Sequence, residues 1–114
     1  MVDMGDMEKR EEKREEMFAY FIGNLSSDNP SLRFGAVHSL GRMNDPRAIE
    51  PLLGMLDDDD WRVRFKVVWA LGRLGDLHVL PFLHRLSRDE SETVRDSVQQ
   101  AKDEIIRRES LKNR

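Results

Sequence analysis

The sequence predicts an all-α fold built as a short α-solenoid of about six helices, and a 31-residue repeat is the main reason. The dipeptides Leu32-Arg33, Val63-Arg64 and Val94-Arg95 are each 31 residues apart. Leu40-Gly41-Arg42 returns at the same interval as Leu71-Gly72-Arg73. A period of this length is typical of stacked helix pairs, each of which buries its apolar face only against its neighbours. Because such arrays offer extended surfaces, we expect a binding module.

The period divides the chain into first and second helices of such pairs. A half repeat opens the array, two full repeats follow, and a half repeat closes it. The expected parts are a disordered N-terminus at 1–7, a half repeat at 8–25, repeats at 26–56 and 57–86, a half repeat at 87–106, and a charged tail at 107–114.

The first helix is expected to begin at Glu8, because residues 1–7 have no periodicity. Its first half is polar on every side, and apolar residues follow at helical spacing from Met17. The string Phe21-Ile22-Gly23 returns 31 residues later as Leu52-Leu53-Gly54. This helix therefore corresponds to the second helix of a repeat whose first helix is absent.

Turn signals separate the helices of the two full repeats. Ser26–Pro30 is a turn and N-cap cluster before the first helix of repeat 26–56. Pro46 can open the second helix, because a proline is tolerated in the first turn. Pro51 and its counterpart Pro81 lie further along, which favours second helices that begin a few residues late. The second repeat follows the same plan, and the last half repeat has only a first helix.

Composition narrows the class of protein. The net charge is −3, and the segments 26–56, 57–86 and 87–114 each balance to zero, so no basic region favours nucleic-acid binding. The chain has no cysteine, which excludes disulfides and thiol chemistry. Its N-terminus is acidic and polar, unlike a signal peptide, and no apolar run approaches roughly 18 residues. We expect a cytoplasmic protein without a membrane anchor or cofactor.

The repeat pattern also resembles a known family. The pattern x-V-R-x-x-A-x-x-A-L-G-x-L-G-D, followed by x-x-L-P-x-L-x-x-L, is similar to HEAT-like repeats of the phycobilisome-lyase type over about residues 17–106. This resemblance implies a right-handed α-α superhelix. Relatives of this type include bilin lyase subunits, deoxyhypusine hydroxylases and small scaffolding proteins. The hydroxylases hold iron with His-Glu dipeptides, whereas this chain has His38-Ser39, His78-Val79 and His84-Arg85, so that metal chemistry is not implied.

The repeated arginines are candidates for structural contacts. Each of Arg33, Arg64 and Arg95 follows an aliphatic residue near a helix start, and we expect this residue to be buried. We expect them to form hydrogen bonds between repeats with turn aspartates, with Asp45 and Asp76 among the partners. The alternative is a ladder that binds anions.

Two surfaces are candidates for partner binding. One is an outer aromatic-basic strip formed by Arg62, Lys66, Trp69 and Arg73, in which Trp69 either stacks under an arginine or is an exposed anchor. The other is a groove, expected if the second helices line the concave side as the resemblance implies. Its non-core residues are Tyr20, Asn24, Glu50, Met55, Leu80, His84 and Arg85.

These patterns favour a non-enzymatic scaffold or adaptor that binds another protein, because the chain has no recognisable catalytic constellation. One alternative is an accessory subunit of a lyase-type complex that handles a cofactor. A second alternative is weak nucleic-acid binding through the strip. The two half repeats leave helix faces that a neighbour would normally cover, so we expect a monomer or a weak homodimer through these ends.

Overall fold

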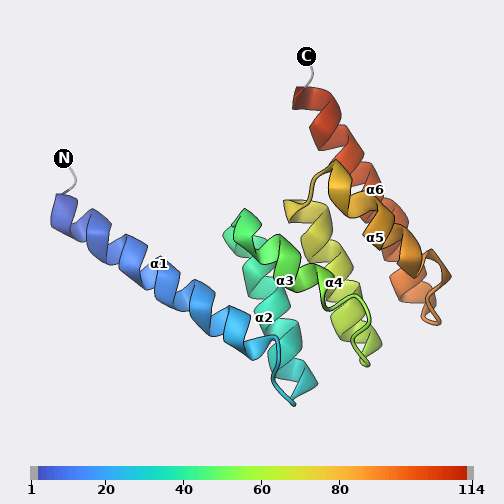
Figure 1. Ribbon diagram of the computed structural model, residues 1–114, viewed down its shortest axis with the longest axis horizontal. Coiled ribbons are helices and arrows are strands. Elements are labelled where there is room, and N and C mark those ends of the chain that lie inside the picture. Colours follow the sequence, from blue (N-terminus) through green and yellow to red (C-terminus); the bar gives the residue numbers. More distant parts are fainter. Residues whose placement is uncertain (1–2, 113–114) are drawn as a thin grey trace.

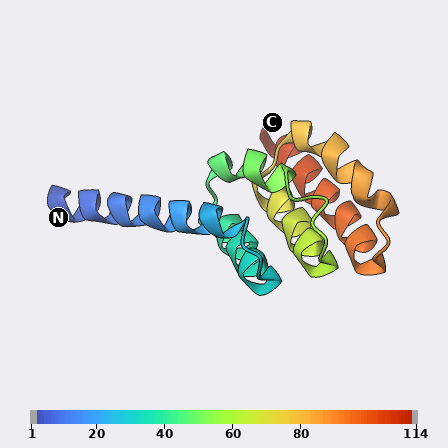
Figure 2. The same ribbon diagram turned by 60° about the horizontal axis from the view of Figure 1, so that its bottom comes forward.

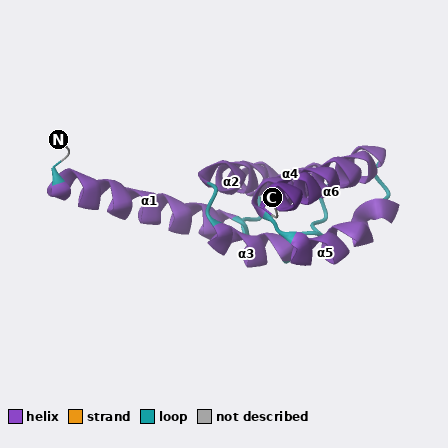
Figure 3. Cartoon of the chain, turned by 90° about the horizontal axis from the view of Figure 1, so that it is seen from above, coloured by secondary structure: helices purple, strands orange, loops and turns teal. Residues whose placement is uncertain are grey.

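The computed structural model describes residues 3–112 and contains six α-helices in two layers (Figure 1). The first helices of the repeats form one layer: α2 (Pro30–Met43), α4 (Trp61–Leu74) and α6 (Glu92–Lys112). The second helices form the other: α1 (Met4–Asn24), α3 (Ile49–Leu53) and α5 (Leu80–His84). Figure 3 shows the layers one above the other. The fold is therefore the all-α solenoid that the repeat predicts.

Side-chain caps explain where the first helices begin. Asn29 accepts a hydrogen bond from the backbone N–H of Ser31, with Pro30 in the first position of α2. Asp60 does the same for Arg62 at the start of α4. These caps satisfy backbone donors that have no partner within the helix. Helix α2 ends at Asn44, whose φ of 57° lies in the left-handed region that Asn tolerates.

The second helices are short and begin with 3₁₀ turns. Pro46–Ala48 (η1) precedes α3, and Leu77–Val79 (η2) precedes α5. A further 3₁₀ turn, Arg85–Arg88 (η3), follows α5. The late starts predicted from Pro51 and Pro81 are therefore confirmed, because Pro46 opens a 3₁₀ turn and the α-helix begins at Ile49.

The core lies between the layers and is continuous through both full repeats. Leu40, Leu71 and Leu83 are completely buried there, with Leu52 from α3. The glycines of the repeated Leu-Gly-Arg motif let first helices approach closely. A Cβ on Gly41 would lie 2.6 Å from the Trp69 ring, and on Gly72 it would lie 3.0 Å from the Cβ of Ala101. The motif therefore marks the closest contacts between neighbouring repeats.

The structure differs from the expected organisation at both ends. Helix α1 begins at Met4, capped by Asp3, so residues 4–7 are helical instead of disordered. Residues 1 and 2 lie outside the described part. At the other end α6 continues through Lys112, so the charged tail is helical over residues 107–112.

Helix α1 projects from the rest of the solenoid, which is formed by α2–α6 (Figure 2). Its C-terminal part packs against the core through Phe18, Phe21 and Ile22. None of its residues is fully buried. The N-terminal end of the predicted polar half extends away from the other helices, whereas its last part still contacts the turn before α3 through the Glu15–Arg47 ion pair.

Candidate functional site

Arg33 and Arg64 form the inter-repeat contacts expected of the arginine series. The Arg33 Nε and Nη2 donate to the two carboxylate oxygens of Asp58 at 2.9 and 3.1 Å, and Arg64 binds Asp89 with the same distances. The Nη1 of each also donates to a backbone carbonyl, that of Ser27 at 2.9 Å and that of Asp58 at 2.6 Å. Each arginine therefore joins the turn before its own helix to the turn before the next first helix.

The Arg64–Asp89 pair is the more buried of the two, with side chains only 8% and 6% exposed. Burial opposes ionisation of Asp89, but hydrogen bonds from the Arg64 guanidinium and the Ser91 N–H hold the pKa of Asp89 below its usual value. The carboxylate therefore stays charged, and a buried charge that loses its partner is costly.

Arg95 makes only the backbone contact of this set. Its Nη1 donates to the carbonyl of Asp89 at 2.6 Å, as the two earlier arginines do to their own turns. Among residues 3–112 it has no carboxylate within ion-pair distance. It belongs to the series by position and backbone contact only.

Asp45 and Asp76 are not partners of the arginine series, and that part of the prediction was wrong. Both cap 3₁₀ turns by accepting from the backbone N–H two residues on, and they bind the side chains of Arg47 and His78. The arginines bind Asp58 and Asp89 instead, because these two aspartates lie in the turns just before α4 and α6.

The second-helix layer has its own inter-repeat contacts, made by Arg47 and His78. Arg47 also binds Glu15 on α1 at 2.7 Å, and His78 lies 3.4 Å from Glu50 on α3. A hydrogen bond with Asp76 raises the pKa of His78 above its usual value. These two side chains bridge consecutive second helices.

Two cations of the aromatic-basic strip pack against Trp69, which lies at the centre of the strip. The His38 ring stacks on Trp69 at 5.1 Å with an interplanar angle of 10°. Lys66 Nζ lies 4.3 Å and Arg73 Cζ 5.2 Å from the Trp69 ring centroid. Of the two predicted alternatives, Trp69 takes the stacked one and is half-buried.

The cations of the strip have further partners within the chain. Lys66 also lies over the ring of Phe34 on α2, and burial lowers its pKa. Arg73 Nε donates to the carbonyl of Gly41 at 3.1 Å. Arg62 binds Asp60. Lys66 and Arg73 therefore connect α4 to α2. All three cations of the strip already have partners within the chain.

The predicted groove residues divide by exposure. Tyr20 is 61% exposed, and Glu50, His84 and Arg85 are also exposed on the second-helix layer. Asn24 and Leu80 are half-buried. Met55 is 9% exposed and belongs to the core, so its assignment to the groove surface was wrong.

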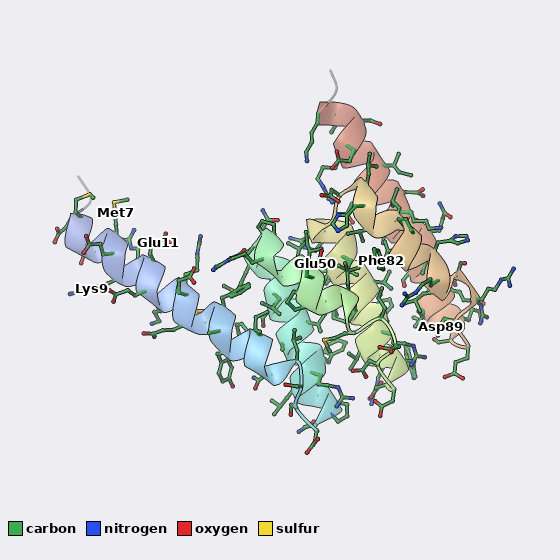
Figure 4. All side chains as sticks on the ribbon, viewed as in Figure 1. Met7, Lys9, Glu11, Glu50, Phe82 and Asp89 are labelled. Carbon is green, nitrogen blue, oxygen red and sulfur yellow. The ribbon has the colours of Figure 1, made fainter. Side chains whose placement is uncertain are left out.

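The sequence reasoning missed Phe82, which is 37% exposed on α5. Figure 4 places Glu50 and Phe82 on the neighbouring helices α3 and α5 of the second-helix layer. The Arg85 guanidinium lies 5.9 Å from the Phe82 ring centroid. No recurring motif includes Phe82, and only its position in a short second helix could have indicated exposure.

Comparison with known families agrees with this geometry. A family model described as HEAT repeats matches residues 20–102, which is most of the chain. The chain belongs to the HEAT-repeat family. No curated protein sequence matches it. HEAT repeats generally serve as protein-interaction scaffolds, because stacked helix pairs build extended surfaces.

Between residues 3 and 112, no three His, Asp or Glu side chains gather in a way that could hold a metal ion. The helices described there include none that is long and apolar enough to cross a bilayer.

Proposed function

We propose that this HEAT-repeat chain is a cytoplasmic, non-enzymatic scaffold that binds a protein partner through its second-helix layer. The observation that carries the proposal is the contrast between two aromatic groups. Tyr20 and Phe82 are exposed on the second-helix layer, whereas Trp69 is stacked between His38 and two cations.

The exposed residues of the second-helix layer suit protein recognition. Tyrosine and arginine are enriched among residues that dominate binding energy, and aromatic rings bury large areas at small entropic cost. Tyr20 on α1 and Phe82 on α5 supply such rings, and Glu50, His84 and Arg85 add exposed polar groups to the same layer. Interfaces typically combine aromatic residues with polar groups of this kind.

The aromatic-basic strip suits nucleic acid less well. Phosphate binding requires cations that can leave their present partners. Lys66 and Arg73 contact Trp69, and Arg62 binds Asp60. Recruiting Lys66 and Arg73 would also break their contacts with Phe34 and Gly41 on α2, so we place weak nucleic-acid binding behind protein binding.

Affinity capture with cross-linking from the native source tests this proposal. The double variant Tyr20→Ala, Phe82→Ala should lose a stoichiometric partner that the wild-type chain retains. Trp61→Ala is the matched control, because Trp61 is an aromatic residue 45% exposed at the start of α4, away from this layer. A partner kept by the double variant but lost on Lys66→Ala would instead assign binding to the strip.

We also propose that the repeats are of the phycobilisome-lyase type, on the strength of the Leu-Gly-x-Leu-Gly-Asp pattern at residues 71–76. An accessory role in a bilin-handling complex would accompany that subtype. An absorbance scan of the purified protein with and without added bilin tests it. Unchanged bilin absorbance would contradict the bilin-handling role and would not affect the scaffold proposal.

A further inference from the structure

A hollow of about 560 Å³ lies between α1 and the C-terminal end of α2, and cations dominate its lining. Its walls are Arg10, Lys13, Arg14 and Met17 from α1 and Arg42 and Met43 from α2. Glu11 is the one acid in the lining. The lining therefore carries a local excess of positive charge in a chain whose net charge is negative.

A four-residue charge repeat explains why one side of α1 is basic. The segment Glu8-Lys9-Arg10-Glu11 is followed at once by Glu12-Lys13-Arg14-Glu15. Residues four apart lie on the same face of a helix, so the bases gather on one side of α1 and the acids on the other. Arg10, Lys13 and Arg14 from the basic side line the hollow, whereas Lys9 lies outside the lining. Figure 4 shows Lys9 on the opposite side of α1 from Glu11, which does line the hollow.

The charges that line the hollow are not neutralised within the chain. Across the described residues, none of its four cations has a carboxylate within 4 Å. Arg33, Arg47 and Arg64, in contrast, each bind at least one carboxylate. The cations of the hollow are therefore available to an external anion.

Two methionines make the hollow partly apolar. Met17 is 44% exposed and Met43 is half-buried. Methionine adapts its shape to varied apolar partners because its side chain is unbranched and flexible. An occupant would thus gain from apolar side chains as well as negative charge, which a phosphate backbone does not offer.

We propose that this hollow binds an acidic segment of a protein partner, with apolar side chains against Met17 and Met43. The inference rests on the proposed protein-binding function and adds the class of ligand. Opposite charge steers such a segment to the hollow, and the methionines favour an amphipathic one.

Fluorescence anisotropy with defined probes tests the inference. The probes are a short labelled peptide of alternating Glu and Leu, an all-Glu peptide of equal length, and an oligothymidylate of comparable charge. Arg10→Glu should weaken binding of the Glu-Leu peptide about tenfold, whereas Lys9→Glu should change it less than about twofold. Lys9 is the matched control because it is adjacent, has the same charge and lies outside the lining.

Two further variants separate charge from apolar contact. Met17→Gln should weaken the Glu-Leu peptide several-fold and leave the all-Glu peptide unchanged. Lys13→Glu should reproduce the effect of Arg10→Glu from another turn of α1, which guards against a local folding defect at residue 10.

Three outcomes would overturn the inference: no binding of either peptide, equal loss with Lys9→Glu and Arg10→Glu, or tighter binding of the oligothymidylate. If partner capture still depends on Tyr20 and Phe82, such a result removes the hollow and leaves the proposed function standing. If instead the peptides bind as expected but partner capture does not depend on Tyr20 and Phe82, the hollow stands and the proposed function is removed.

Discussion

Arg64 and Asp89 form a two-point ion pair whose side chains are both more than nine-tenths buried, 25 residues apart in the sequence. The pair joins α4 to the turn before α6. Because Arg64 also holds the carbonyl of Asp58, one guanidinium connects two consecutive turns.

Removing one partner of this pair should be strongly destabilising. Arg64→Met leaves the Asp89 carboxylate buried without a counter-charge, and we expect a loss of about 3 kcal/mol in the free energy of unfolding. Urea denaturation measures it. Arg95→Met is the matched control, since Arg95 makes only the backbone contact, and it should cost about 1 kcal/mol. Equal losses would contradict the assigned role of the carboxylate.

The two glycines of α2 should respond in opposite directions to alanine. Gly41→Ala places a Cβ against the Trp69 ring and should cost about 1–3 kcal/mol through forced repacking. Gly35→Ala meets nothing within 4 Å and should stabilise the helix by about 0.5–1 kcal/mol. Thermal or urea unfolding of both variants checks this. A stabilised Gly41→Ala would show that Trp69 does not pack as described.

His38 and His78 should give stability opposite dependences on pH. Burial lowers the pKa of His38 below 6.5, with the Lys66 charge as a lesser cause, so its contribution is full above that pH and falls as the pH drops toward the folded pKa. The hydrogen bond to Asp76 raises the pKa of His78, so its contribution is full below 6.5 and is lost as the pH rises through the folded pKa.

Substitution separates the two histidines. Urea midpoints between about pH 5 and 8 should lose their acid-side fall in His38→Gln and their alkaline-side fall in His78→Gln. NMR titration of the two imidazoles gives an independent check. A His38 pKa above that of His78 would refute the environments described here.

Self-association should be weak. The terminal helices expose apolar side chains, including Met4 and Met7 on α1 and Ile106 and Leu111 on α6. These residues are scattered and lie among charges, so sedimentation should find a monomer or a weakly associating dimer. A tight tetramer would contradict this expectation.

Much of the architecture could be predicted from the periodic pattern. The 31-residue interval led to the helix pairs, and Pro46 and Pro51 indicated the late second helices. The structural role of Arg33 and Arg64 was also correctly predicted. The start of α1 was not, because its first turn depends on the cap at Asp3 and has little apolar periodicity.

The carboxylate partners of Arg33 and Arg64 could not be predicted as easily from the sequence. Asp58 and Asp89 are 31 residues apart, yet Asp58 lies within a run of four aspartates, and helix periodicity does not show which of them faces Arg33. The four-residue charge repeat of α1 was visible, but its meaning needed the position of α2 beside it.

The sequence by itself determined where most of the helices lie, how they repeat and which arginines recur. Only the tertiary structure decided that Trp69 is stacked, that Met55 is buried, and that Asp89 in place of Asp76 binds Arg64. The physical reason is that helix periodicity is a local property of the backbone. A contact between side chains of different repeats depends instead on how closely and at what angle those helices pack.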